Sequence, residues 1–192
     1  MGSPSDIDLS LANIWKSWYN FRKGKRNSQA ILEFEWQLES NLMSLEEDLS
    51  AGSYMHGSYD HFIVNEHKRR DIAVASVRDR VVHRLIYDYL VPLCDKRFDY
   101  DVWSCRTGKG NSAALERTAQ LLRKYPTACV WRGDIQKFFD SINQLKLLQL
   151  IKRYPVSDKA YEILDKIINS YPVYLDRQTD RQTDRQDCPL AI

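Results

Sequence analysis

The sequence predicts an α+β fold with a small sheet. Three observations indicate this class: apolar residues recur at helical spacing along much of the chain, the periodicity changes to two between residues 59 and 75, and a short apolar run lies near residue 130. With 192 residues, 43% of them hydrophobic and 11% aromatic, the chain can fill the core of one domain or of two small ones. We therefore expect a globular protein.

Two amphipathic helices are expected in residues 1–54. Apolar side chains mark the first helix between Leu11 and Phe21, and the polar stretch Lys23-Gly24-Lys25 ends it. A longer apolar stripe marks the second helix, which ends at Ala51-Gly52-Ser53, where a glycine suits a C-cap. The stripe consists of Ile31, Phe34, Leu38, Leu42, Leu45 and Leu49. These helices would form an N-terminal helical extension.

A β-hairpin and a capped helix are expected next. Tyr59 to Asn65 and Arg69 to Ala75 show strand periodicity and are joined by the polar turn Glu66-His67-Lys68, so basic residues lie at the hairpin tip. Ser76-Val77-Arg78-Asp79 has the form of a capping box and opens a helix. Pro92 is expected to kink or interrupt that helix.

The remaining pattern predicts one strand among further helices. A loop near Gly108 precedes a helix that stops at Tyr125-Pro126. Ala128 to Asp134 is expected to form a strand, and two helices should follow, from about Gln144 to Arg153 and from Ser157 to Ser170. The predicted order is two helices, a hairpin, two helices, a strand and two helices.

Charge and cysteine content limit the partners and the cellular compartment that we expect for this protein. The net charge of +2 does not by itself imply a nucleic-acid partner, but residues 67–84 are strongly basic. The four cysteines form no CxxC pair, which argues against structural zinc and a disulfide framework and favours free thiols. The sequence has no long apolar run and no signal-peptide pattern, so we expect a cytoplasmic protein that does not enter a membrane.

Three segments together resemble the fingers and first palm motif of reverse transcriptases. They contain His67-Lys68-Arg69-Arg70-Asp71, Arg106-Thr107-Gly108-Lys109-Gly110 and Gly133-Asp134-Ile135, in that order. The bacterial enzymes of group II introns, retrons and diversity-generating retroelements are the most similar kind. The resemblance covers about residues 55 to 172. It implies right-hand polymerase fingers in residues 55–127 and a partial palm in residues 128–175.

The resemblance assigns Asp134 as a catalytic carboxylate that binds Mg²⁺, with the backbone carbonyl of Ile135 as a further ligand. This assignment agrees with the chemistry of Mg²⁺, which takes few protein carboxylates and completes its octahedron with water and phosphate oxygens. A lone Asp at a strand end can instead be a helix cap. In the complete family, two metal ions support nucleotidyl transfer by an RNA-directed DNA polymerase.

The resemblance also implies a site for the deoxynucleoside triphosphate. Phe139 would exclude a 2′-hydroxyl, and the amides of Lys137 and Phe138 would cradle the triphosphate. Arg70 would grip the phosphates, with Lys68 or Arg69 as a second cation, because a guanidinium forms paired charge-assisted hydrogen bonds. The alternatives are an ordinary core Phe139 and a merely solvated basic hairpin tip.

Four cations are candidates for contact with the backbone of an RNA template and a DNA or RNA primer. They are Arg78, Arg80, Arg106 and Lys109. Asp79 is expected to pair with a neighbouring arginine, and His83 is expected to make a polar contact within its helix bundle rather than take part in catalysis.

The family pattern stops after Asp134. A Tyr-X-Asp-Asp segment is absent, so we expect a truncated, inactive form, or alternatively a non-catalytic module that binds RNA or a hybrid duplex. Retroelement mobility and phage defence both remain open as biological roles.

The tail, residues 176–192, begins with repeats of Asp-Arg-Gln-Thr. The codons GAC AGA CAG ACA encode Asp-Arg-Gln-Thr and are also three copies of the four-base unit GACA, in which slippage would shift the reading frame. We therefore expect a disordered tail translated out of frame; a native in-frame repeat and a sequencing error are the alternatives.

Overall fold

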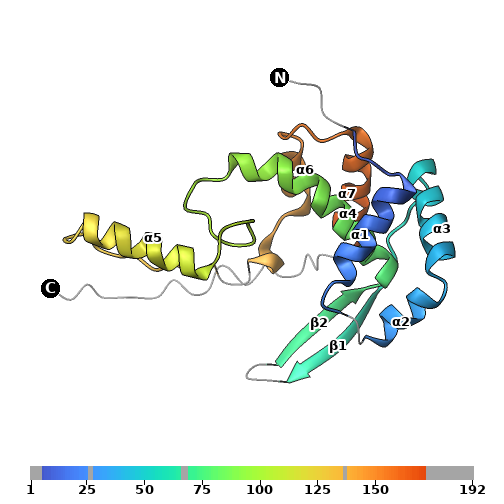
Figure 1. Cartoon of the computed structure of the whole chain (residues 1–192), viewed down its shortest axis with the longest axis horizontal. Helices are drawn as coiled ribbons and strands as arrows, with labels where there is room; N and C mark the ends of the chain where they lie inside the picture. Colours follow the sequence, from blue (N-terminus) through green and yellow to red (C-terminus); the bar gives the residue numbers. More distant parts are fainter. Residues whose placement is uncertain (1–5, 26–27, 66–68, 136–137, 172–192) are drawn as a thin grey trace, which may run out of the picture.

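The computed structural model describes residues 6–25, 28–65, 69–135 and 138–171 (Figure 1). The described residues form seven α-helices and one two-stranded antiparallel sheet, which confirms the α+β class. The helices are α1 (Leu11–Arg22), α2 (Gln29–Trp36), α3 (Leu38–Ala51), α4 (Val77–Cys94), α5 (Asn111–Lys124), α6 (Gln144–Ile151) and α7 (Asp158–Ser170). The strands are β1 (Tyr59–Asn65) and β2 (Arg69–Ala75), and the short 3-10 helices are η1 (Asp95–Arg97) and η2 (Phe139–Ser141).

The second predicted helix is in fact two helices, α2 and α3. Gln37 lies between them with a φ of −122° and a ψ of 38°, outside the helical region. The side-chain amide of Asn41 donates a hydrogen bond to the carbonyl of Phe34 across this break, at 2.9 Å. The change of direction brings the Phe34 ring to 5.2 Å from the ring of Trp18 on α1. Gly52, with a φ of 72°, ends α3 as the sequence predicted.

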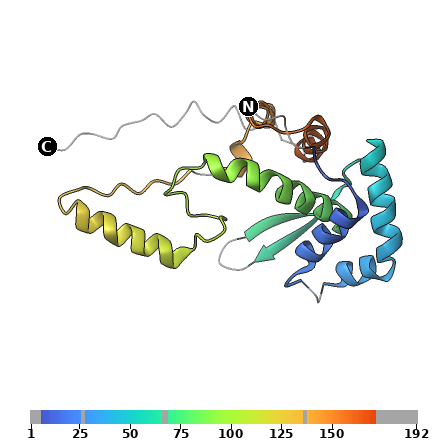
Figure 2. The same ribbon diagram turned by 45° about the horizontal axis from the view of Figure 1, so that its top comes forward.

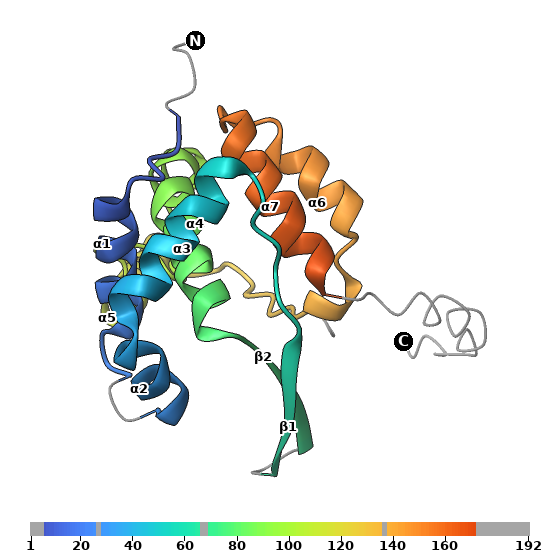
Figure 3. The same cartoon turned by 90° about the vertical axis from the view of Figure 1, so that its right-hand side faces the viewer.

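The hydrophobic core lies where α1, α3, α4 and α7 meet (Figure 3). It is built from the apolar stripes of these helices, and its largest fully buried side chain is Trp18. Other members with no exposed surface are Ile14, Leu42, Leu45, Val81, Val82 and Ala160. The N-terminal helices and α4 therefore share one core, although the sequence analysis assigned them to two regions, the helical extension and the fingers.

The β-hairpin has the predicted strand bounds and projects from the helical body (Figure 1). Its register pairs Tyr59 with Ala75 at the base and Asn65 with Arg69 at the far end. Phe62 and Ile63 point to opposite faces of the ribbon, and each is 50% exposed. Neither face of the hairpin is therefore fully covered by the helices.

Helix α4 begins at the predicted cap. The Ser76 hydroxyl accepts a hydrogen bond from the amide of Asp79, as an N-cap requires. The helix continues through Pro92 to Cys94, so the expected interruption is wrong. Since Pro92 lies in the last turn, its missing amide removes a hydrogen bond only where the helix is about to end.

The Asp79 carboxylate is buried at the N-terminus of α4, with 2% of the residue exposed. It accepts hydrogen bonds from the Tyr54 hydroxyl at 2.8 Å, the Gly57 amide at 3.2 Å and the Ser76 hydroxyl at 2.6 Å. The sequence predicted an arginine as the partner, and the described structure instead supplies these three neutral donors. They connect α4 to the segment that precedes the hairpin.

Helix α5 forms an arm that extends away from the core (Figure 2). It ends before Tyr125 as predicted, but none of its residues is buried. The strand predicted for Ala128 to Asp134 is wrong: this stretch has no regular secondary structure, and Trp131 is 89% exposed. Its apolar pattern suits a strand, but the described residues offer it no neighbouring strand for backbone pairing.

The fold predicts different costs for two leucine truncations. Leu45→Ala, at a fully buried position, should lower the free energy of unfolding by about 2–5 kcal/mol because it leaves a cavity. Leu115→Ala on α5, where the residue is 71% exposed, should change it by less than about 0.5 kcal/mol. Urea denaturation of both variants measures the difference. Equal losses would show that the arm is packed as tightly as the core.

Candidate nucleic-acid interface

The far end of the hairpin presents two arginines to solvent. Arg70 lies opposite Val64 and Arg69 lies opposite Asn65, so the two guanidinium groups leave opposite faces of the ribbon. Both residues are exposed. No carboxylate among the described residues lies within ion-pair distance of either one. Lys68, the third predicted cation of this tip, lies outside the described residues.

Arg78 and Arg80, the two predicted nucleic-acid contacts on α4, make different contacts within the structure. Arg78 forms an ion pair with Asp48 of α3 at 2.5 Å, and its guanidinium lies 5.5 Å from the centre of the Tyr54 ring. Arg80 lies over the Phe21 ring of α1 at 5.2 Å, and burial lowers the pKa of its guanidinium below its ordinary value. Arg78 therefore fastens α4 to α3, and Arg80 contributes to packing between α4 and α1.

Arg106 organises the loop between η1 and α5. Its guanidinium donates to the Asp95 carboxylate at 2.6 Å and to the carbonyls of Asp99 and Val102 at 2.9 and 3.2 Å. The hydrogen bond from Arg106 is the main cause of a lowered pKa of the Asp95 carboxyl. One side chain thus closes a loop whose backbone has few partners of its own.

Lys109 strengthens the same loop. Its ammonium group contacts the carbonyl of Tyr100 and lies 4.0 Å from the centre of the Tyr100 ring and 4.6 Å from that of Trp103. Gly108 has a φ of 74°, a conformation that favours glycine, and it reverses the chain between Arg106 and Lys109. Both predicted nucleic-acid contacts of this loop are therefore engaged internally in the described structure.

Asp134 lies in the irregular segment that follows α5 and is exposed. Its carboxylate accepts a hydrogen bond from the backbone amide of Ile135 at 3.0 Å, and Ile135 is itself 65% exposed. The described residues contain no group of three or more His, Cys, Asp or Glu side chains that could hold a metal ion. A single solvated carboxylate is not a complete Mg²⁺ site, so among the described residues Asp134 would supply only part of the predicted one.

The predicted aromatic pair is solvent-facing. Phe139 is 84% exposed and Phe138 is 48% exposed, with ring centres 5.4 Å apart and planes at 64°. The alternative in which Phe139 is an ordinary core residue is therefore wrong for this structure. Lys137 lies outside the described residues, so the turn that would cradle a triphosphate is not described. Asp134 and Phe139 both lie on the exposed chain between α5 and α6.

No protein-family model matches this chain, and no curated protein matches it. The resemblance to reverse transcriptases therefore rests on the motifs quoted above.

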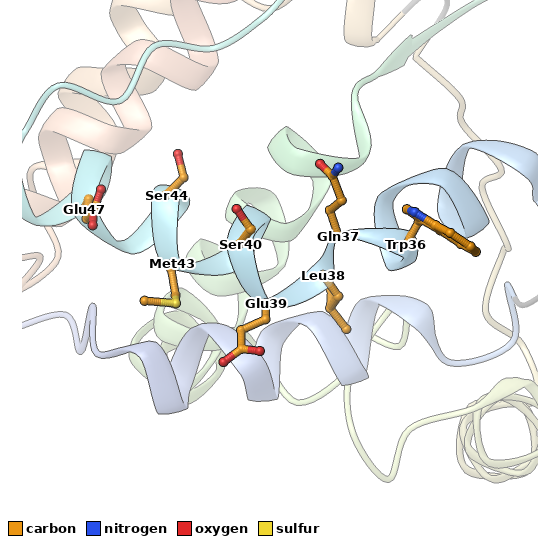
Figure 4. Close-up of a pocket in the computed structure, with 8 residues that line it drawn as sticks. All are labelled: Trp36, Gln37, Leu38, Glu39, Ser40, Met43, Ser44 and Glu47. Carbon is orange, nitrogen blue, oxygen red and sulfur yellow. The ribbon is translucent and has the colours of Figure 1, made fainter.

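Other surfaces of the described residues are less suited to nucleic acid. An open groove of about 700 Å³ follows the break between α2 and α3 (Figure 4). Its lining contains the carboxylates of Glu39 and Glu47 and no basic side chain. A polyanion would be repelled there.

None of the described helices combines the length and apolar character needed to cross a membrane. Cys94, Cys105 and Cys129 are free thiols, as predicted.

Sequence reasoning missed one cluster, which lies beside Asp79. His56 and His83 face each other through their Nε2 atoms at 3.0 Å. The predicted polar contact of His83 is confirmed, but its partner was not foreseen because His56 lies in the irregular segment between α3 and β1. The capping-box Asp79 was the available signal, since a buried carboxylate requires donors from other segments.

The loop contacts predict a selective change in the pKa of Asp95. In the wild type, this pKa should lie below the ordinary value of 3.8, because the Arg106 guanidinium stabilises the carboxylate. Arg106→Gln should raise it towards 3.8 in an NMR titration of the side-chain carbons. Arg117→Gln is the matched control, because Arg117 pairs with Asp101 instead. An unchanged pKa in Arg106→Gln would contradict the assignment.

Proposed function

We propose that this chain supplies the fingers and the first palm segment of a reverse transcriptase, and that the 192 residues alone bind nucleic acid without synthesising DNA. The observation that carries the proposal is the β1–β2 hairpin, which presents Arg69 and Arg70 to solvent and leads directly into the capped helix α4. This arrangement is compatible with the resemblance, in which the hairpin cations meet the phosphates of a nucleic acid or a nucleotide.

The ion pairs that the predicted basic residues already make favour the hairpin as the binding site. Arg78 and Arg106 already have carboxylate partners, so moving them onto a phosphate would break an ion pair. Arg69 and Arg70 have no such partner among the described residues, and a guanidinium makes paired hydrogen bonds to phosphate oxygens. A polyanion could therefore bind the two hairpin arginines, unlike Arg78 and Arg106, without breaking an ion pair of the described residues.

The proposal keeps Asp134 as the first carboxylate of the polymerase, with Mg²⁺ as its cofactor, and Phe139 as the residue that excludes a ribose hydroxyl. Both side chains are exposed and accessible to substrate. The further carboxylates would come from outside these 192 residues, so we assign the chain alone no catalytic step. Its ligands would be an RNA template, a DNA or RNA primer and deoxynucleoside triphosphates. The free thiols suit action in the cytoplasm.

A dedicated binding module, unconnected with any polymerase, is the second candidate. The single exposed carboxylate at Asp134 favours it, because binding a duplex through Arg69 and Arg70 requires no metal. The two candidates differ in one respect: only the first requires a polymerase activity when the missing palm segments are supplied.

Binding to an RNA–DNA hybrid should depend on the hairpin arginines. The double variant Arg69→Gln/Arg70→Gln should bind more weakly, and the slope of log K against log salt concentration should become shallower by about two. Filter binding across a salt series measures both quantities. The control, Arg153→Gln/Lys159→Gln, removes the same charge from two exposed positions of the α6–α7 region and should leave the slope unchanged. Equal effects of the two variants would refute a hairpin site.

Primer extension tests the catalytic part of the proposal. The purified 192-residue chain should incorporate no deoxynucleotide on a primed RNA template with Mg²⁺, because one solvated carboxylate cannot organise two metal ions. Incorporation that persists in Asp134→Asn would come from a contaminating polymerase. Incorporation that is lost in Asp134→Asn would overturn the claim that the chain alone is inactive.

A further inference from the structure

The base of the hairpin is held by a pair of histidines that shares a hydrogen bond. His56 Nε2 and His83 Nε2 are 3.0 Å apart, and the two rings are nearly parallel, with centres separated by 5.1 Å. His56 belongs to the segment between α3 and β1, and His83 lies on α4. The side chain of His56 is 1% exposed. This contact is therefore a buried link between the hairpin and the helical core.

The neighbouring groups determine which nitrogen carries the proton. His56 Nδ1 lies 2.7 Å from the carbonyl of Gly57, which can only accept, so Nδ1 carries a hydrogen. In the neutral ring, His56 Nε2 is then an acceptor, and His83 Nε2 must be the donor. The described residues provide no third ligand that would make this pair a metal site. One proton therefore lies between the two facing nitrogens.

The surroundings of His83 oppose an additional proton on its ring. Burial is the main cause of a lowered pKa of His83, with His56 and Arg80 acting in the same direction and Asp79 against them. Asp79 Oδ2 lies 3.9 Å from His56 Nδ1, and its carboxylate is already occupied by Tyr54, Gly57 and Ser76. Two tyrosines are further titratable groups near the pair: Tyr59 stacks on His56, and Tyr171 meets Tyr59 edge-on.

These tyrosines connect the histidine pair to the last helix. The His56 ring stacks on Tyr59, the first residue of β1, with ring centres 5.0 Å apart. The Tyr59 hydroxyl is hydrogen-bonded to the Ser170 hydroxyl at the end of α7, at 2.9 Å, and its ring meets Tyr171 edge-on. A displaced His56 would therefore loosen the first residue of the hairpin from both α4 and α7.

We propose that the His56–His83 pair is a proton-operated latch, which holds the base of the β1–β2 hairpin against the core at neutral pH and releases it in acid. When both facing nitrogens carry protons, the N–H···N hydrogen bond is replaced by two repelling N–H groups in a buried site. The latch depends only on these contacts and is independent of the polymerase proposal.

The direction of the pH dependence follows from the neutral state. The folded protein disfavours the charged form of His83, whereas the unfolded chain takes up a proton near the ordinary pKa of 6.5. The stabilisation by the latch is therefore fully present above pH 6.5 and declines as the pH falls below it towards the lower folded-state pKa.

Amide hydrogen exchange of the full 192-residue chain tests the latch. Protection factors of residues 59–65 and 69–75, corrected for intrinsic rates, should fall about tenfold or more between pH 7.5 and pH 5.0, while those of α1 and α3 stay constant. In His83→Gln, whose amide can still donate to His56 but does not titrate, hairpin protection should not depend on pH. The control is His61→Gln, which removes an exposed histidine of β1 and should behave as the wild type.

Two outcomes would overturn the latch: a wild-type pH dependence in His83→Gln, or an equal loss of protection in α1 and α3. If His83→Gln does not fold, nitrogen-15 NMR of the wild-type imidazoles decides. At pH 7.5 it should show His56 protonated at Nδ1 and His83 at Nε2. Other tautomers, or titration of the His83 ring at its ordinary pKa, would refute the proposal.

Discussion

The buried carboxylate of Asp79 is the constraint on which the placement of the hairpin depends. A charge with so little contact with water is tolerated only when its oxygens are hydrogen-bonded, and three donors surround this one. Tyr54 and Gly57 precede β1, and Ser76 follows β2, so both ends of the hairpin are tied to the first turn of α4. The positive end of the α4 dipole also favours a negative charge there. A ribbon that extends from the core is thus anchored by polar contacts at its base.

The cations of the chain divide into those that build the structure and those that remain available to a partner. Arg78, Arg106 and Lys109 join elements or close a loop, whereas Arg69 and Arg70 face solvent at the end of the ribbon. The net charge of +2 conceals this division, because 26 acidic residues offset 28 basic ones whatever contacts each residue makes. Among the described cations singled out by the sequence, only Arg69 and Arg70 are therefore exposed and without an internal contact that a polyanion would have to replace.

Sequence patterns predicted the elements that are determined locally and missed those that depend on distant partners. The hairpin bounds, the Ser76 cap and the Gly52 cap follow from periodicity and backbone preference within a few residues. The strand expected at Ala128 to Asp134 failed because a strand requires a neighbour, which local periodicity does not supply. Two donors of Asp79, Tyr54 and Gly57, and the His56 partner of His83 were likewise unpredictable, since each comes from a segment more than twenty residues away. The sequence indicated the residues of the candidate site. It did not indicate which of the positively charged side chains already have a partner within the structure.

The two-stranded form of the hairpin also affects how the protein behaves at high concentration. Each strand pairs with the other on one side only, so both outer edges present backbone donors and acceptors without a strand neighbour in the described sheet. Half-exposed Phe62 and Ile63 add apolar surface on the two faces. Such edges promote strand addition between molecules, and charged residues such as Asp60, Arg70 and Asp71 oppose it by repulsion and hydration. Because salt screens that repulsion, high ionic strength favours self-association through the ribbon, and dilute low-salt buffer favours the monomer.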